Sequence, residues 1–216
     1  MIFTYNKEQV GDVLMVIVAE DKGQAVQFER KGQAVQFERK GKVARVFLAE
    51  TGKTVAWNIF EASSLVELTG NGQVFLTDEQ VATLNAVLAE EGFTESLVND
   101  NAPKFVVGQI AELVPHPDSD HLNICQVNVG DKTVQIVAGA PNAAQGLKTI
   151  VALPGAMMPS GSLIFPGKLR GEDSFGMMCS PRELALPNAP QVRGIIELDD
   201  SAVVGEAFDP AKHWKG

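Results

Sequence analysis

The densest group of residues that could do chemistry lies at positions 116–121, which read His-Pro-Asp-Ser-Asp-His. Imidazole and carboxylate groups at this short spacing suit zinc or iron, so half of a metal site is one interpretation. The alternative is a turn in which Pro117 fixes φ and Asp118 or Asp120 bonds to nearby backbone. A hydrolytic metal centre needs further ligands, and the remaining histidine is His213 near the C-terminus. The spacing therefore favours the turn, and we expect no metal or other cofactor.

A second candidate is the cation pair Lys168 and Arg170, framed by Gly167 and Gly171. Residues at i and i+2 of an extended segment share one face, so both charges could meet one phosphate backbone. The alternative is a solvated hairpin. Lys148 belongs to the same acid-free window, which runs from residue 132 to residue 171. This local excess of positive charge could also be chance sparsity of acids in a β-rich core.

The stretch Ser180-Pro181-Arg182-Glu183 has Ser, Pro and Glu at the N-cap, N1 and N3 positions of a capping box. It predicts a helix that starts at Ser180. A helix N-terminus offers free N–H groups to an anion, with Arg182 beside it. The alternative is a plain cap that closes one end of a barrel. Met178 fits either a core or an adaptable apolar contact.

A fourth candidate, Asn142, ends the turn that starts at Gly139. Its amide could face a ribose or a base edge, or it could belong to a plain surface turn. Few aromatic residues accompany these candidates, with Phe165 and Phe175 the nearest in sequence. Proteins that bind single strands without sequence preference stack bases on several rings. We therefore expect the site to favour backbone and shape over serial base stacking.

The overall composition limits the possible functions. The 216 residues carry a formal net charge of -9, which argues against a polycation that coats nucleic acid or membranes. The longest apolar run, Val13–Ala19, is far shorter than the roughly 20 residues of a membrane span. We expect a cytoplasmic protein without membrane contact. Cys125 and Cys179 lack metal-ligand spacing and are expected to be reduced core thiols.

Residues 1–100 are expected to form an acidic α+β domain of unknown role, with nine basic and fifteen acidic side chains. A helix begins at the capping box Thr77–Gln80 and stops at Gly92. Short apolar or alternating runs bounded by polar residues predict strands over 13–19, 43–49, 55–60 and 64–68.

A linker-like segment, Asn99–Pro103, is expected to separate this domain from an all-β domain over 103–210. Its apolar stretches are separated by Gly, Pro and Asn turns, which is typical of a small barrel. We predict a five-stranded barrel with a short helix and a C-terminal extension. The expected strands cover 105–110, 124–129, 133–137, 149–153, 163–164 and 194–198.

A nine-residue repeat lies in the first domain, where Lys22–Arg30 recurs unchanged as Lys31–Arg39. Nine is odd, so the two copies cannot present the same face of one straight strand. We expect a hairpin turn over Arg30–Gln33, with Gly32 supplying the unusual backbone angles, or one copy looped out as an insertion. The repeat is assigned no chemistry.

Eight short segments of the second domain form a recognisable series along the chain. They are Phe105–Gly108, His116–Leu122, Gly139–Asn142, Gly155–Ala156, Pro159–Gly161, Lys168–Gly171, Ser174–Ser180 and Glu183–Leu184. Taken together and in this order, they resemble the tRNA-binding domain shared by the phenylalanyl-tRNA synthetase β subunit, some methionyl-tRNA synthetases and endothelial monocyte-activating polypeptide. With its acidic first domain, the chain is similar to the YtpR family of stand-alone bacterial tRNA-binding proteins.

The resemblance implies an oligonucleotide-binding (OB) fold that holds structured tRNA without catalysis. The positions that match the family's motif and could touch RNA are Asn142, Lys168, Arg170, Met178 and Ser180, and local charge adds Lys148 and Arg182. The family usually has Lys where this chain has His121, and often Cys where it has Ala138. Loss of that lysine predicts weaker binding.

Three hypotheses follow. The first is a non-enzymatic tRNA-binding protein that is expected to form a homodimer. The second is a chaperone-like or assembly module, which a hydrophobic groove near residues 157–158 and 177–178 would support. In that case the acidic first domain would contact a protein partner. The third, a metal-dependent hydrolase, depends on the His116 cluster.

Overall fold

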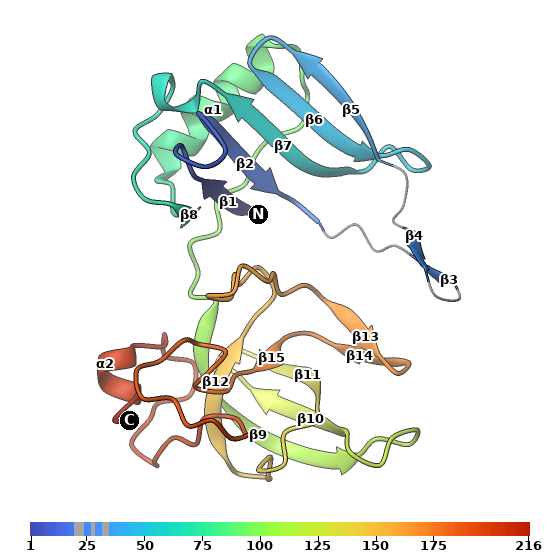
Figure 1. Cartoon of the computed structure of the whole chain (residues 1–216), viewed down its shortest axis with the longest axis vertical. Coiled ribbons are helices and arrows are strands. Elements are labelled where there is room, and N and C mark those ends of the chain that lie inside the picture. Colours follow the sequence, from blue (N-terminus) through green and yellow to red (C-terminus); the bar gives the residue numbers. More distant parts are fainter. Residues whose placement is uncertain (20–23, 27–28, 32–34) are drawn as a thin grey trace. The chain divides into compact units, whose positions relative to one another are not determined.

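The computed structural model describes residues 1–19, 24–26, 29–31 and 35–216 (Figure 1). The chain divides into two compact units, Met1–Asn101 and Ala102–Gly216, each of which is described by itself. The division falls within the polar segment that the sequence marks as a linker.

Unit 1 is built on a six-stranded antiparallel sheet of order β5-β6-β7-β2-β1-β8. A separate short hairpin pairs β3 with β4. The strands predicted from residues 13, 43 and 55 are confirmed. The strands are β1 Ile2–Tyr5, β2 Val13–Ile17, β3 Gln24–Val26, β4 Glu29–Lys31, β5 Val35–Lys40, β6 Val43–Leu48, β7 Thr54–Phe60 and β8 Gly72–Val74.

Helix α1, Asp78–Glu90, covers one face of this sheet (Figure 1). It starts as predicted, because the Thr77 hydroxyl accepts from the Gln80 N–H and the Gln80 side chain accepts from the Thr77 N–H. Gly92, with φ 79°, follows its end. The apolar face of α1 packs on side chains from β1, β2 and β7, which form the core of the unit. Its members include Phe3, Tyr5, Leu14, Val16, Trp57, Ile59, Leu84 and Leu88.

The strand predicted over 64–68 is wrong. The chain forms a 3-10 turn there, η1 Ala62–Ser64, after Glu61 takes the left-handed φ of 53°. The Asp12 carboxylate caps this turn by accepting from the Ser63 N–H at 2.9 Å and from the Ser63 hydroxyl at 2.8 Å. A side chain distant in sequence thus fixes a turn that apolar spacing alone does not indicate.

Strand β4 spans the junction of the two nonapeptide copies, and their other described residues lie in different strands. The second copy supplies β5, which pairs with β6 from Val35↔Leu48 to Lys40↔Val43. The first copy contributes to the hairpin of β3 and β4. The turn predicted over Arg30–Gln33 is wrong for its first half, because Arg30 and Lys31 pair with β3 as part of β4. Residues 32 and 33 lie outside the described residues.

Unit 2 is a nearly closed five-stranded barrel, which confirms the predicted fold class. Its sheet has the order β11-β10-β9-β12-β15, and a bulge between Gln126 and Val127 bends β10 against β9. The two edges of this sheet are β11 and β15. They are brought close to each other by the segment before β15, where the Phe175 N–H donates to the Gln135 carbonyl of β11 at 2.8 Å. The strands are β9 Phe105–Pro115, β10 Asn123–Asn128, β11 Thr133–Ala138, β12 Lys148–Ala152 and β15 Met177–Met178, with the hairpin β13 Gly167–Leu169 and β14 Glu172–Ser174 beside them.

The helix predicted from Ser180 is wrong beyond its first turn. The Leu184 N–H donates to the Ser180 carbonyl at 3.2 Å, but Ala185 already takes the left-handed φ of 51°. The Leu186 N–H then donates to the Pro181 carbonyl at 3.0 Å, which closes the turn as a helix C-terminus would. The short helix of unit 2 is instead α2, Pro210–His213, in the C-terminal extension.

Two short strands predicted in unit 2 are also corrected. Residues 194–198 run as an extended segment whose one bridge joins Leu198 to Lys148, and residues 163–164 contribute one bridge, Met157↔Leu163. The extended segment is attached to the barrel by single backbone hydrogen bonds and not by a continuous ladder. In one of them the Ile196 N–H donates to the Cys179 carbonyl at 2.9 Å. The segment is apolar because it covers the barrel core, not because it joins the sheet.

Cys125 and Cys179 are buried free thiols, as expected. Burial raises the pKa of Cys125 to about 11 and that of Cys179 to about 12. Among the described residues, every helix is too short or too polar to cross a bilayer.

Candidate nucleic-acid interface

A groove of about 380 Å³ opens on unit 2 beside the end of β11. Four segments form it: the end of the loop before β10, the end of β11 with the turn after it, the chain from β15 to Glu183, and the extended segment around Ile195. The groove gathers three of the sequence-predicted residues, Met178, Ser180 and Arg182. Its other lining residues are His121, Leu122, Ile136, Val137, Ala138, Gly139, Ala140, Pro141, Met177, Glu183, Arg193, Gly194 and Ile195.

The first wall is held by the capping box that the sequence predicts. The Glu183 carboxylate accepts from the Ser180 N–H at 2.8 Å and from the Ser180 hydroxyl at 2.7 Å. The Ser180 hydroxyl in turn accepts from the Glu183 N–H at 3.3 Å. Ser180 is 8% exposed and Met178 is 5% exposed, so both shape the wall from within. Two exposed side chains lie on this wall: that of Glu183, which holds Ser180, and that of Arg182, whose guanidinium donates no hydrogen bond within the described part of the chain.

The second wall is held by Asn142. Its Oδ1 accepts from the Ile195 N–H at 2.9 Å, while its Nδ2 donates to the Ile195 carbonyl at 3.0 Å and to Glu197 Oε1 at 2.8 Å. The amide predicted to face RNA is therefore occupied by the protein's own backbone. Arg193 lies two residues before Ile195 and donates from Nη2 to the Gly139 carbonyl at 3.4 Å.

The hairpin of β13 and β14 carries the cation pair Lys168 and Arg170. Lys168 Nζ lies 3.0 Å from Asp173 Oδ1 across the hairpin, and both side chains are largely exposed. Arg170 and Gly171 form the two-residue turn, with φ of 48° and 92°. Two positive φ values are typical of the type I′ turn, so Arg170 projects from the hairpin end and not from a strand face.

The loop that carries His121 is electrostatically coupled to this hairpin. The pKa of Asp120 is lowered chiefly by a hydrogen bond to His121, with Nδ1 and Oδ1 2.8 Å apart, and the charge of Arg170 lowers it further. Arg170 therefore acts on the loop whose His121 lines the groove.

His116 has a structural place in that loop. Its side chain is 3% exposed, and its Nδ1 accepts from the Asp118 N–H at 3.0 Å, which is a turn of the kind the spacing favours. Nε2 is buried without a hydrogen-bond partner. Within the described residues, no three His, Cys, Asp or Glu side chains are grouped so that they could hold a metal.

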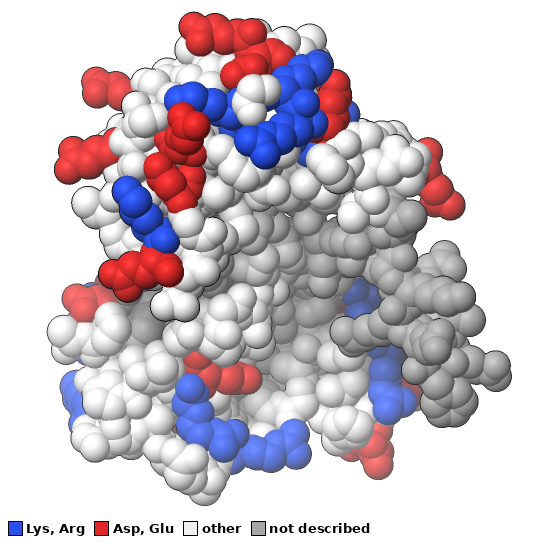
Figure 2. All heavy atoms as spheres, turned by 45° about the horizontal axis from the view of Figure 1, so that its top comes forward, with Lys and Arg blue, Asp and Glu red and all other residues white. Residues whose placement is uncertain are grey.

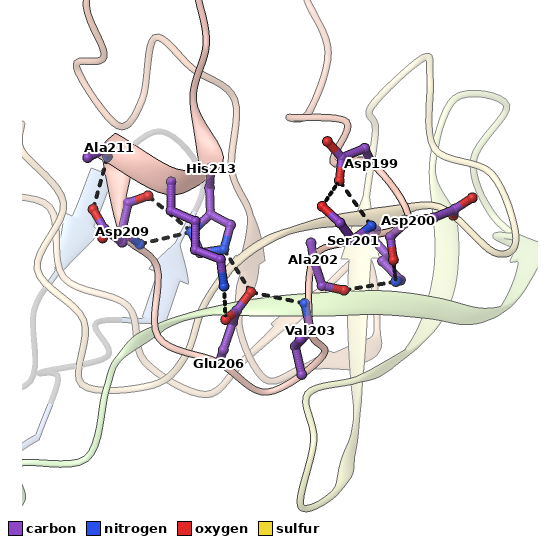
Figure 3. A network of polar contacts seen from close by, with 11 residues as sticks. Asp199, Asp200, Ser201, Ala202, Val203, Glu206, Asp209, Ala211 and His213 are labelled. Atoms are coloured by element: carbon purple, nitrogen blue, oxygen red, sulfur yellow. Dashed lines mark hydrogen bonds and ion pairs between the residues drawn. The ribbon is translucent and has the colours of Figure 1, made fainter.

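Lys148 lies outside the groove, in the C-terminal extension's network of polar contacts. Its ammonium donates to the Asp200 and Ala202 carbonyls, at 2.9 and 2.8 Å. Asp200 and Ala202 belong to the network drawn in Figure 3. The same network continues to Glu206, which accepts from the Val203 N–H and contacts His213. Lys148 therefore fastens the extension to β12.

Charge on the molecule is mixed. On the face shown in Figure 2, Lys and Arg side chains lie among Asp and Glu side chains. Local cations thus have to act against an acidic background, since the whole chain carries -9.

Arg193 is the cation that the sequence analysis missed. It lies directly before the stretch 194–198 that is expected to be a strand, and nothing in its spacing connects it to Arg182. The groove brings the two together because the Asn142 bonds draw the segment around Ile195 back to the turn after β11.

Comparisons with known proteins agree with this division of the chain. Residues 105–207 match a family model described as "Putative tRNA binding domain", and residues 30–100 match "Domain of unknown function (DUF4479)". The chain is 45% identical over 204 residues to "Putative tRNA-binding protein YtpR" of Bacillus subtilis strain 168, which covers 94% of this chain and 97% of that protein.

Part of the chain is also similar to a much longer protein. It is 46% identical over 126 residues to the phenylalanine–tRNA ligase beta subunit of Sulfurimonas denitrificans, and over 134 residues to that of Rhodospirillum rubrum. These matches cover 58% and 60% of this chain but 16% of each ligase subunit.

Proposed function

Because the chain belongs to the YtpR family, we propose that it binds structured tRNA through the groove of unit 2 and catalyses no reaction. The observation that carries this proposal is the pairing of Arg182 and Arg193 on the two walls of one groove. Guanidinium groups suit phosphate oxygens, and contacts to phosphate position a protein on RNA.

The proposed contacts differ in kind. Arg182, Arg193, Lys168 and Arg170 are exposed and would meet the RNA backbone directly. Ser180, Met178 and Asn142 would act by shaping the walls, and Lys148 by fastening the extension. The side of the groove formed by the end of β11 and the turn after it carries small apolar side chains, those of Ala138, Ala140 and Pro141. This lining supports binding by shape rather than by stacking of bases on aromatic rings.

The rest of the molecule fits a binding protein. We propose a cytoplasmic homodimer whose acidic unit 1 serves a protein partner, because a domain with six more acidic than basic side chains repels RNA. The chaperone-like alternative has less support. The groove is lined by Met177 and Met178, but Met158 and Met178 are buried, so the methionines offer little exposed apolar surface to a client.

A titration of the full chain tests the proposed function. Total tRNA and a single-stranded DNA of equal charge are compared by fluorescence anisotropy at two salt concentrations. We expect tRNA to bind more tightly, with log K falling by about 0.7 to 0.9 per log unit of salt for each phosphate contact.

Two outcomes would contradict the proposal. Equal affinity for DNA would indicate a generic strand binder, and binding that ignores salt would exclude phosphate contacts. A protein that binds neither nucleic acid but captures unfolded polypeptide would favour the chaperone-like alternative.

A further inference from the structure

The edge strand of unit 1 has a duplicate in its own chain. β5 forms six register pairs with β6, from Val35↔Leu48 to Lys40↔Val43. Its sequence, Val-Gln-Phe-Glu-Arg-Lys, is also the sequence of residues 26–31. The identity extends on both sides, because residues 22–32 and 31–41 are the same eleven residues.

Every contact of β5 can be supplied by the first copy. The Arg39 guanidinium lies 4.0 Å from the centre of the Phe60 ring, and its Nε donates to the Gly41 carbonyl at 3.3 Å. Lys40 Nζ lies 4.7 Å from the centre of the Phe93 ring. The first copy has Arg30, Lys31 and Gly32 in the same order.

We propose that the segment 26–31 can replace β5 on the edge of the sheet, so that unit 1 exchanges between two registers nine residues apart. A slip of one residue turns every side chain to the wrong face, and a strand is normally held in register by that penalty. Here the penalty vanishes, because replacement of the whole strand by its duplicate restores each side chain to its own face.

Loop closure sets the balance between the two registers. In the observed register two residues, Gly41 and Lys42, join β5 to β6, whereas eleven residues would join them after the exchange. The probability that a loop closes falls with its length to the power of about 3/2, which disfavours the exchanged register by about 13-fold. The connection from β2 to the edge strand shortens from seventeen residues to eight, which favours the exchanged register by about threefold. Loop closure then favours the observed register by about fourfold. The β3–β4 hairpin of that register adds little, because an isolated two-stranded hairpin is marginally stable at best.

The exchange has a definite structural consequence. It breaks the hairpin of β3 and β4, because Val26 and Glu29–Lys31 belong to the segment that moves. It also moves the nine surplus residues from one end of the edge strand to the other. Deletion of residues 22–30 and deletion of 31–39 give the same chain, in which only one register exists.

Competition between two cysteines for a third measures the exchange in the full-length chain. Arg39 lies opposite Ala44 in the observed ladder, and Arg30 takes that place after the exchange. In the triple variant Arg30→Cys, Arg39→Cys, Ala44→Cys, disulfide exchange at equilibrium should give bonds 39–44 and 30–44 in a ratio of about four to one. The control is Glu29→Cys with Ala44→Cys. It moves the thiol from residue 30 to the preceding residue, which in the exchanged strand faces the opposite side of the sheet.

A stability measurement covers the case in which the cysteine variant does not fold. Phe37→Pro with Glu38→Pro disrupts the β5 ladder, because one of two successive residues must direct its N–H toward β6. In the full chain the first copy takes over, so the unfolding equilibrium should shift by at most about fivefold. In the chain without residues 22–30 the same double substitution has no substitute strand, and the loss should be far larger.

Three results would overturn the proposal: a 30–44 disulfide no more frequent than the Glu29 control, a 30–44 disulfide only between chains, or equal proline effects in the two chains.

Discussion

Asn142 holds Ile195 by both of its backbone groups, accepting its N–H at 2.9 Å and donating to its carbonyl at 3.0 Å. In a β-sheet, a neighbouring strand binds the N–H and the carbonyl of one residue in this way. Here the Asn142 side chain does so for the single residue Ile195. The extended segment around Ile195 thereby becomes one wall of the groove without joining the sheet.

The first prediction is that Asn142→Ala loosens this wall. Removal of the amide leaves the Ile195 N–H and carbonyl without partners, which should lower the free energy of unfolding of unit 2 by about 1 to 3 kcal/mol. Affinity for tRNA should fall as well, because Arg193 loses its fixed position. Denaturant unfolding and anisotropy titration measure the two effects.

Asn142→Asp separates the two roles of the amide. It keeps the oxygen that accepts from the Ile195 N–H, but it loses the donor and faces the Glu197 carboxylate. At pH 7 the repulsion between the two carboxylates should make this variant no more stable than Asn142→Ala, and protonation at lower pH should relieve it. An Asn142→Ala variant as stable as the original chain would contradict the assignment.

The second prediction concerns the two guanidinium groups of the groove. Arg182→Ala and Arg193→Ala should each weaken tRNA binding, and each should reduce the salt slope by about one phosphate contact. Both residues are exposed, so folding should change little. The matched control is Lys132→Ala, which removes the same charge from an exposed turn of unit 2 outside the groove. If all three variants lose the same affinity for tRNA, the loss comes from the change in net charge and not from contacts within the groove.

The third prediction separates charge from backbone at Arg170. Its φ of 48° suits Gly and Asn better than Ala, so Arg170→Gly and Arg170→Asn keep the turn while Arg170→Ala strains it. If the guanidinium meets phosphate, all three variants should bind tRNA about equally weakly. If Arg170 matters only for the turn, the Ala variant alone should lose affinity.

Sequence patterns predicted local structure well where short-range contacts decide it. The Thr77–Gln80 capping box and Gly92 gave both ends of α1, and the capping box at Ser180 exists with all its bonds. The helix after Ser180 fails because Ala185 turns left-handed and Pro187 follows within two residues. A capping box specifies how a helix starts and not how long it runs.

Long-range bonds explain what the sequence could not predict. Asn142 was expected to face RNA, but its partners lie 53 residues away in a segment whose apolar pattern resembles a strand. Lys148 likewise bonds to carbonyls 52 and 54 residues away. Polar residues were identified as important, while their partners, and so their roles, depended on tertiary structure.

The fourth prediction follows from the buried thiols. Burial raises the pKa of Cys125 to about 11 and that of Cys179 to about 12, so almost no thiolate forms at pH 8. Native protein should therefore resist iodoacetamide at pH 8, while protein in denaturant should react at both positions. Mass spectrometry of the alkylated chain gives the count, and rapid labelling of either residue in the native state would contradict it.

The fifth prediction is that acid releases the C-terminal extension. Glu206 contacts Lys212 and His213 and accepts from the Val203 N–H (Figure 3). The pKa of Glu206 falls to about 2, chiefly through its hydrogen bond from Lys212. A carboxyl group with a lowered pKa in the folded state stabilises that state above its ordinary pKa of 4.5, and this stabilisation is lost as the pH falls toward 2.

The indole N–H resonances of the two tryptophans measure this release within one sample. Trp214 follows α2 and donates to the Pro187 carbonyl at 2.7 Å, whereas Trp57 lies in the core of unit 1. Between pH 4.5 and 2 the Trp214 signal should change before the Trp57 signal does. Glu206→Gln should remove that pH dependence and leave the extension more weakly attached at pH 7. If the Glu206→Gln chain shows the same acid midpoint at Trp214, another carboxyl group must hold the extension, with Asp199, which pairs with Lys215, the next candidate.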